Sequence, residues 1–381
     1  MNTQEKPAFP YHILLNPEDI CNYTELKNQL VAETLRGERL VLFGRRNTGK
    51  TSLVRSVIIP NFRKKHKNSL VVFCDFLGCR TLSQLDDRIR LGFQEGFSRS
   101  YPVKNTFLKM FQLIQSLRPS FEADPTTGEL RMTVEVTSSG ATLGTAEKII
   151  QKIGEIHSSH RVLLVFDEFQ DIAFISEAEA RLRRCLQELP SNLSVIVLGS
   201  KKHLLSAMFS KPKAPFASWG LPVEIPPIHV QDYTHYINTR LKPYGQSISK
   251  ECVSLLMERM QGIPESINIV CSIMTTTGWK GSLDKERIER GIQLTLDRFQ
   301  STFYETLSQF TEVEQRFLIS LAKLQPLLQP RGKEFVSASQ LASATIGKQI
   351  RHMEDEAVIY RLENGYVLAD PLLAVFLKSR M

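Results

Sequence analysis

Residues 44–51 read Gly44-Arg45-Arg46-Asn47-Thr48-Gly49-Lys50-Thr51 and match the pattern GxxxxGK[ST] at every fixed position. The apolar run ERLVLF at 38–43 leads into this segment and is typical of a buried strand, and a helical pattern follows it until Pro60. Glycines let the backbone N–H groups point inward at a phosphate, and the start of a helix adds partial positive charge. The segment therefore predicts a phosphate-binding loop between a strand and a helix.

Two side chains at the end of this loop have defined expected roles. Lys50 should reach the β- and γ-phosphates of a nucleoside triphosphate, and the Thr51 hydroxyl should ligate Mg²⁺. The alternative is a glycine-rich turn that matches the pattern by chance. It is disfavoured because both the preceding strand and the following helix are present in the pattern.

A second motif, Val162-Leu163-Leu164-Val165-Phe166-Asp167-Glu168, delivers two acids at the end of an apolar strand expected at 161–169. Ligands of open parallel sheets bind at this end of the strands. We expect Asp167 to hold the metal, directly or through water, and Glu168 to act as the general base on the attacking water. The alternative is two solvated acids. Asp171 is expected to be a cap or a salt-bridge partner.

Ser200 ends another apolar run, LSVIVLGS at 193–200. A polar side chain there would lie beside the γ-phosphate and sense it. Ser200 is equally suited to be the N-cap of the next helix, and one serine can do both. Lys201 and Lys202 either face the phosphates or are solvated.

Apolar strands alternate with helices in the first 227 residues, which predicts an α/β fold with a parallel sheet covered by helices on both faces. RMTVEVT at 131–137 alternates and predicts a small strand or hairpin arm.

After residue 230 the pattern is helical. Three helical patterns and a hairpin signal at Glu363-Asn364-Gly365 end the chain as in a winged helix. We expect a P-loop core at 1–227, a helical lid at 228–307 and a winged-helix domain at 308–381. The remaining expected elements are strands at 69–76 and 221–227 and helices near 18–35, 176–189, 230–242, 248–260, 264–276 and 284–307.

The composition of the chain limits the classes of protein to which it can belong. The chain has 381 residues, 42% of them hydrophobic, and a formal net charge of +8. No apolar run reaches the roughly 18 residues that a membrane span needs, and the N-terminus has no secretory pattern, so we expect a cytoplasmic protein with no membrane partner. The six scattered cysteines are expected to be reduced and mostly buried. The basic charge permits nucleic acid as a partner without establishing it.

At these motifs the chain resembles the archaeal-type ATPases of the STAND group, within the P-loop class that has an extra strand and a catalytic glutamate. The resemblance rests on GRRNTGKTSL at 44–53, FDEFQD at 166–171, LGS at 198–200, VEIPPIHVQDYTHYI at 223–237 and GYVLADPLLAVFLK at 365–378. It implies ATP and Mg²⁺ as cofactors and extends the expected nucleotide contacts to Ser52. Gly262-Ile263-Pro264 matches the family's Gly-x-Pro, which implies that Pro264 packs near the nucleotide.

The chain departs from this family in two places. Relatives often carry an arginine just before the lid, whereas Phe216-Ala217-Ser218-Trp219-Gly220 has none. Loss of such an arginine can cost about 10³–10⁵ in rate, so we expect slow turnover unless Arg181, Arg183, Arg184 or a second subunit supplies one. Asn22-Tyr23-Thr24-Glu25 keeps a glutamate but lacks the arginine often found beside the adenine, which leaves base specificity open.

Three functions follow from these patterns. The favoured one is an ATP-hydrolysing nucleotide switch whose lid closes on the core, acting with a protein partner or by self-association. The alternative is a DNA-binding ATPase, a loader, transposition helper or regulator, with Thr345–Glu356 as a recognition helix. Residues 311–381 carry nine basic and eight acidic residues, a balance that disfavours DNA. The third is a scaffold without turnover, which the intact Lys50, Asp167 and Glu168 argue against.

Overall fold

The computed structural model of this chain describes residues 7–100, 117–123, 130–136 and 144–380. The chain forms two compact units. The first, here called the helical unit, comprises Met1–Tyr23, Arg45–Ser52 and Pro226–Met381. The second, the sheet unit, comprises Thr24–Gly44 and Leu53–Ile225. The expected division into 1–227, 228–307 and 308–381 stays a prediction.

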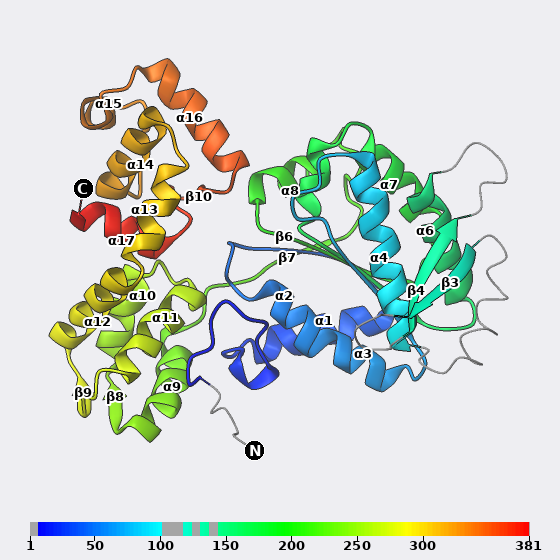
Figure 1. The fold of residues 1–381 in the computed structure, drawn as a ribbon, viewed down its shortest axis with the longest axis horizontal. Helices are drawn as coiled ribbons and strands as arrows, with labels where there is room; N and C mark the ends of the chain where they lie inside the picture. Colours follow the sequence, from blue (N-terminus) through cyan, green and yellow to red (C-terminus); the bar gives the residue numbers. More distant parts are fainter. Residues whose placement is uncertain (1–6, 101–116, 124–129, 137–143, 381) are drawn as a thin grey trace. The chain divides into compact units, whose positions relative to one another are not determined.

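A five-stranded parallel sheet forms the centre of the sheet unit (Figure 1). Its strand order is β2-β5-β6-β1-β7. In β5, Leu164 and Phe166 belong to the hydrophobic core on one face of the sheet. Leu163 and Val165 alternate with them and are fully buried as well. Strands buried on both faces form continuous apolar runs, which explains why the sequence pattern located β1, β2, β5 and β6. β7 is an edge strand with mostly exposed residues. The strands are β1 (Arg39–Phe43), β2 (Leu70–Asp75), β5 (Val162–Asp167), β6 (Ser194–Gly199) and β7 (Leu221–Glu224).

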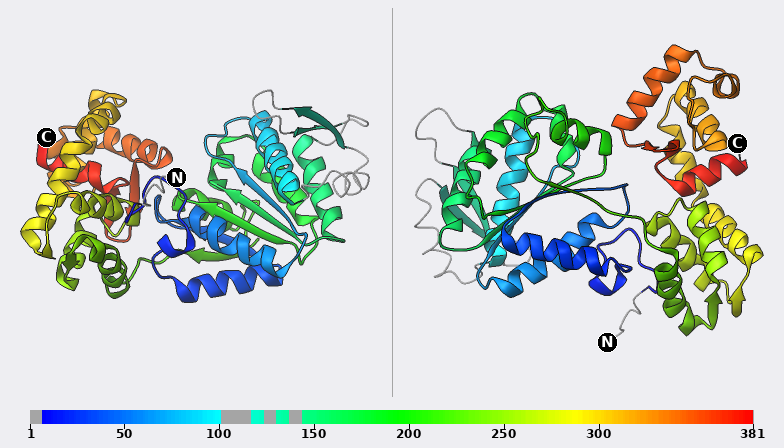
Figure 2. Two further views of the ribbon diagram at one scale, coloured as in Figure 1. Left: turned by 60° about the horizontal axis from the view of Figure 1, so that its bottom comes forward. Right: turned by 180° about the vertical axis from the view of Figure 1, so that it is seen from behind.

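Helices cover both faces of this sheet, as expected (Figures 1 and 2). α1 and α3 lie on one face, and α4, α6 and α7 lie on the other. A separate antiparallel hairpin, β3–β4, contains the strand expected at 131–137 up to Val136; Thr137 lies outside the described residues. The bounds are α1 (Thr24–Arg36), α3 (Ile59–Lys65), α4 (Leu82–Ser100), α6 (Thr145–His157), α7 (Ala178–Gln187), α8 (Lys202–Phe209), β3 (Leu117–Ala123) and β4 (Leu130–Val136).

The helical unit begins its long C-terminal part with α9, α10, α11 and α12, which share one apolar core through residues such as Tyr233, Leu256 and Ile267. Two three-residue strands, β8 and β9, pair in parallel beside these helices. The bounds are α9 (Val230–Leu241), β8 (Gln246–Ile248), α10 (Lys250–Arg259), α11 (Pro264–Thr275), β9 (Gly281–Leu283), α12 (Lys285–Arg298) and α13 (Gln300–Ser308).

The chain ends in three helices and a hairpin, as expected, and a further helix, α17, follows the hairpin (Figure 1). Thr311 caps α14 with its side chain, and Glu314 returns a hydrogen bond to the backbone of Thr311, an arrangement that satisfies two free N–H groups. Gly365 follows the hairpin turn with φ 128°. The bounds are α14 (Glu312–Leu324), α15 (Lys333–Ser339), α16 (Ser343–Asp355), β10 (Ile359–Leu362), β11 (Gly365–Leu368) and α17 (Pro371–Arg380).

Four expectations about local structure were wrong. The helix expected near 18–35 starts only at Thr24, and the helix expected at 284–307 is broken at Phe299 into α12 and α13. The strands β8 and β9 were missed because three residues are too few for a periodic pattern. Pro60 does not end the helix that begins with α2 (Lys50–Leu53). A π-helical segment, Val54–Ile58, intervenes, and Pro60 then lies in the first turn of α3, where its missing N–H is not needed.

Among the described residues, no helix combines the length and the apolar character that membrane crossing requires. All six cysteines are buried and lie outside disulfide bonds, which agrees with the expectation of reduced, buried thiols. Burial raises the pKa of the Cys185 thiol to about 11.

A close contact between α4 and β2 gives a stability prediction. A Cβ on Gly96 would collide with the backbone carbonyl of Val71. A Cβ on Gly154 of α6 would meet side-chain atoms alone, a methyl group of Leu189 at 3.2 Å and Cδ of Pro190 at 3.6 Å. We expect Gly96→Ala to lower the free energy of unfolding by about 1–3 kcal/mol through overpacking. Gly154→Ala is the matched control, and its gain of about 1 kcal/mol in helix propensity should offset any crowding. Equal effects in urea unfolding would contradict this account.

Candidate functional site

The carboxyl edge of the sheet gathers the two acids and the start of the phosphate loop. β6 lies between β5 and β1 in the sheet, and Phe43 at the end of β1 is in register with Gly199 at the end of β6. Asp167 ends β5, Ser200 follows β6, and Gly44 follows β1. Because neighbouring strands are about 4.8 Å apart, these three residues emerge at the same edge of the sheet.

Glu168 is held in a sharp turn just after β5. Its φ of 47° lies in the left-handed region, which is uncommon for a residue with a side chain. Its backbone N–H donates to the Oδ1 of Asp167 at 3.0 Å. Ser200 Oγ and Gln170 Nε2 both donate to its Oε2, at 2.9 and 2.6 Å. The residues that sequence reasoning assigned to the water and to the γ-phosphate, Glu168 and Ser200, thus contact each other directly.

The N-cap alternative for Ser200 was wrong. α8 begins at Lys202 and its N-cap position is Lys201, which makes no side-chain cap. Ser200 is buried and its hydroxyl is bound to Glu168. The structure therefore favours a role for Ser200 in positioning that carboxylate.

Asp171 is a salt-bridge partner, as expected. Its buried carboxylate lies 3.3 Å from Lys201 Nζ and 3.4 Å from an Arg80 guanidinium nitrogen, and it accepts a hydrogen bond from the N–H of Gly78 at 2.9 Å. Lys201 is therefore neither solvated nor directed at phosphates in this structure. Lys202 is exposed and pairs with Glu224.

In the phosphate loop, which belongs to the helical unit, Lys50 is hydrogen-bonded to a backbone carbonyl of the same loop. Lys50 is only 6% exposed, and its Nζ donates to the carbonyl oxygen of Arg45 at 2.8 Å. The Thr48 hydroxyl donates to the same carbonyl. Asn47 and Gly49 have φ of 64° and 87°, and such left-handed steps turn successive N–H groups to one side of a loop. The backbone thus has the curvature that a phosphate cradle requires.

Arg45 links the loop to two distant segments of the same unit. Its guanidinium donates to the backbone carbonyl of Gln261 at 3.2 Å and to the Gln261 side chain at 2.7 Å. It also lies over the ring of Tyr360 in the winged-helix hairpin, 5.4 Å from the ring centre. Burial lowers the pKa of Arg45 to about 10. Sequence reasoning placed Arg45 only among the loop residues and gave no sign of these contacts.

The N-terminal segment is also attached to the loop. The N–H of Leu15 donates to Ser52 Oγ at 3.1 Å. The two residues before it, Ile13 and Leu14, are 59% and 50% exposed although both are large and apolar. Sequence reasoning missed these residues, and their only signal was an apolar pair in an extended segment.

Pro264 is the first residue of α11, and its carbonyl accepts a hydrogen bond from the Tyr233 hydroxyl at 3.2 Å. Gly262, with φ 67°, lies between Pro264 and Gln261. Because Gln261 is the partner of Arg45, the Gly-x-Pro segment follows directly on a residue that touches the phosphate loop. Its contact with a nucleotide stays a prediction.

The arginines considered as triggers for hydrolysis have different surroundings. Arg181 pairs with the buried Glu147, and Arg183 donates to the carbonyl of Pro215 at 2.9 Å. Arg184 is exposed and forms no salt bridge within the described part of the chain. Of the three, Arg184 is therefore the one whose guanidinium is available.

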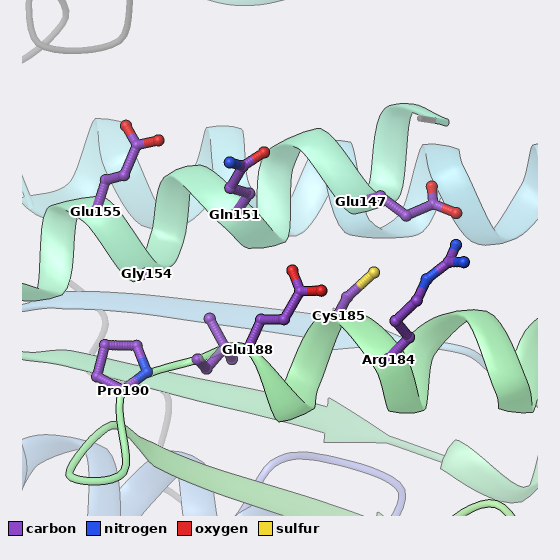
Figure 3. A pocket seen from close by; sticks show the side chains of 9 residues that line it. Glu147, Gln151, Gly154, Glu155, Arg184, Cys185, Glu188 and Pro190 are labelled. Atoms are coloured by element: carbon purple, nitrogen blue, oxygen red, sulfur yellow. The ribbon is translucent and has the colours of Figure 1, made fainter. Parts of the chain in front are cut away.

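Arg184 lines a groove of about 370 Å³ between α6 and α7. Figure 3 shows Cys185 and Glu188 directed from α7 toward α6, with Glu147 across from Arg184. None of the predicted nucleotide ligands lines this groove. Its most buried carboxylate, Glu147, already pairs with Arg181, so we assign it no ligand.

Each unit carries donor groups of the kinds that a magnesium nucleotide needs. The loop of the helical unit has a buried ammonium group at Lys50 and a hydroxyl at Thr51, and the sheet unit has the carboxylate of Asp167, which is 5% exposed. Oxygen donors of these kinds are the ligands that Mg²⁺ prefers. The loop residues and the acids belong to different units, and their individual roles stay predictions.

Comparisons with known proteins support the fold. Residues 301–379 match a family model described as "Probable winged helix domain", and no curated protein matches the chain in sequence. The structure is similar to the Walker-type ATPase PABY2304 of Pyrococcus abyssi, with a TM-score of 0.64 and 15% identity over 97% of this chain and 99% of that one. It is also similar to the ORC2 protein of Aeropyrum pernix, with a TM-score of 0.54 and 12% identity over 98% and 96% of the two chains. This chain therefore has the fold of the P-loop ATPases and carries a winged helix domain at its C-terminal end.

Proposed function

We propose that this chain binds ATP with Mg²⁺, hydrolyses it slowly, and uses the nucleotide as a conformational switch of the lid at 228–307. The observation that carries this proposal is the pair of contacts made by the phosphate loop. Lys50 donates to a carbonyl within the loop, and Arg45 reaches out of the loop to Gln261 and Tyr360. The same short segment thus contains the expected phosphate ligand and the contact with the lid.

Binding would exchange the partners of Lys50. A phosphate oxygen carries more negative charge than a carbonyl oxygen, and charge-assisted hydrogen bonds are roughly twice as strong as neutral ones. Lys50 would therefore leave the carbonyl of Arg45 for the phosphates. The carbonyl that Lys50 would leave and the guanidinium bound to Gln261 both belong to Arg45. A change in the conformation of Arg45 would therefore alter the contact with the lid directly.

Hydrolysis would use the acids at the sheet edge. Thr51 and Asp167 would hold Mg²⁺, which supplies positive charge to the phosphates when bound. Glu168 would orient and deprotonate the attacking water through Oε1, because Ser200 and Gln170 already occupy its Oε2. The absence of an arginine from Phe216-Ala217-Ser218-Trp219-Gly220, just before the lid, supports slow turnover. Arg184 from a second copy is a candidate for the missing arginine.

The adenine would lie against the N-terminal segment. Ile13 and Leu14 expose apolar surface next to Leu15, whose N–H is bound to Ser52 in the helix that follows the phosphate loop. A flat, apolar base would cover this surface and remove it from water. The structure of the Aeropyrum pernix ORC2 protein is one of ADPNP-ADP complexes, which supports an adenine nucleotide as the ligand of a chain with this fold.

Two substitutions separate binding from chemistry. We expect Lys50→Ala to weaken ATP binding about tenfold to a hundredfold, since a hydrogen bond to a charged group is lost. Glu168→Gln should retain ATP binding but lower the hydrolysis rate about 10²–10⁴-fold, because the general base is removed. Calorimetry and phosphate release measure the two effects. Lys202→Ala and Glu224→Gln change an exposed ion pair at the same edge of the sheet and serve as matched controls. Undiminished hydrolysis by Glu168→Gln would refute the role of that glutamate.

The switch itself makes a further prediction. We expect the wild-type chain to give different protease digestion patterns with ADP and with a non-hydrolysable ATP analogue. Arg45→Ala should bind both nucleotides and give one pattern for both, because the contact between loop and lid is gone. Arg259→Ala removes an exposed arginine close to Gln261 that pairs with Glu289, and it should behave like the wild type. Identical wild-type patterns in the two states would rule out the switch while leaving ATP binding intact.

A further inference from the structure

A groove of about 660 Å³ lies within the winged-helix domain. Its three walls are the turn at 328–332, one side of α16, and the hairpin β10–β11. Gly347, Ile350, Arg351 and Glu354 form the α16 wall, and their spacing puts them on one face of the helix. The remaining lining residues are Leu328, Gln329, Pro330, Arg331, Gly332, Arg361 and Tyr366.

Three arginines, one from each wall, give this groove its charge. Arg331, Arg351 and Arg361 are all exposed, and none forms a salt bridge with any residue that the structure describes. This contrasts with Arg181, which has a carboxylate partner. Only one acid, Glu354, lines the groove. The groove is therefore positively charged, and its guanidinium groups are available to an external anion.

A glycine lets one of these arginines lie close to the helix. A Cβ on Gly347 would come within 2.7 Å of the terminal guanidinium nitrogen of Arg331. The side chain of Arg331 therefore rests on α16 at the one position without a side chain. This contact places the guanidinium group of Arg331 in the groove near Arg351, which follows Gly347 by one helical turn.

Apolar surface borders the arginines. Leu328 is 67% exposed, the highest value among the exposed large hydrophobic residues of the described chain. Ile350 is 9% exposed and also lines the groove. A ligand that fills the groove would remove this apolar surface from water, with a gain in free energy.

We propose that this groove binds an acidic segment of a partner protein, with carboxylates paired to Arg331, Arg351 and Arg361 and an apolar side chain against Leu328. Planar guanidinium groups bind carboxylates through two parallel hydrogen bonds. The positive charge and the apolar rim match a chain that alternates acidic and apolar side chains. The residues that carry this inference all belong to the winged-helix domain, and it does not rest on the proposed binding of ATP.

Duplex DNA fits the groove less well. A helix reads DNA by entering the major groove with a protruding face, whereas these arginines line a hollow between three elements. Glu354, Asp355 and Glu356 end α16 and would repel phosphates near it. Single-stranded nucleic acid would need a free aromatic face, but Arg361 lies over the ring of Tyr366 at 5.6 Å.

The test uses the full chain and a fluorescent peptide in which Glu alternates with Leu. We expect binding that weakens with added salt, and a loss of about tenfold or more in the Arg331→Ala/Arg351→Ala/Arg361→Ala variant. Lys348→Ala is the matched control, because Lys348 is exposed on the same helix but does not line the groove. Peptide binding that is unchanged in the triple variant would overturn the proposal.

Two further arms make the assignment specific. Leu328→Ser should weaken the Glu–Leu peptide but not a peptide in which Glu alternates with Ser. Arg351→Glu should weaken the Glu–Leu peptide and strengthen binding of a Lys–Leu peptide, a gain that a misfolded variant would not give. Duplex DNA that displaces the Glu–Leu peptide, and loses affinity in the triple variant more than the peptide does, would replace the acidic segment by nucleic acid.

Discussion

A buried ammonium group must have an acceptor, and the conformation of the phosphate loop depends on this constraint. Lys50 is almost fully buried, and an unpaired charge in such a place costs several kcal/mol. The carbonyl of Arg45 accepts a hydrogen bond from Lys50, and the left-handed steps at Asn47 and Gly49 let the loop turn back far enough for the two groups to meet. A neutral carbonyl is a weaker partner for an ammonium group than a phosphate is. The loop therefore holds its lysine in a position where an incoming anion can compete for it.

The two acids at the sheet edge, Asp167 and Glu168, are also held in place by neighbouring groups. Asp167 is fixed by the end of a buried strand, and Glu168 takes a left-handed conformation directly after it. Such a conformation costs of order 1 kcal/mol for a residue with a side chain, and it persists because Ser200 and Gln170 hold the carboxylate from the neighbouring strand end and the following turn. Ser200 thus acts on Glu168, and the sheet supplies the rigidity that both residues need.

The sequence allowed prediction of whatever depends on short segments. The phosphate loop, the strand ending in Asp167 and the helices of the winged-helix domain have patterns carried by neighbouring residues, and the structure contains these elements. The contact of Arg45 with Gln261 joins residues 216 positions apart, and no local pattern records such a pairing. The π-helical turn before Pro60 could not be predicted for a similar reason, because surrounding packing decides whether a proline ends a helix or begins its next segment.

One strand of the winged-helix hairpin contacts both the phosphate loop and the arginine groove. Tyr360 of β10 lies under the guanidinium of Arg45, and its neighbour Arg361 lines the arginine groove. Successive side chains of a strand point to opposite faces, so a single strand presents one residue to the phosphate loop and the next to the groove. If nucleotide binding displaces Arg45, it removes a contact from the strand that forms one wall of the groove. Coupling between two sites is reciprocal, and an occupant that holds β10 in place would then favour the nucleotide state in which Arg45 stays on Tyr360.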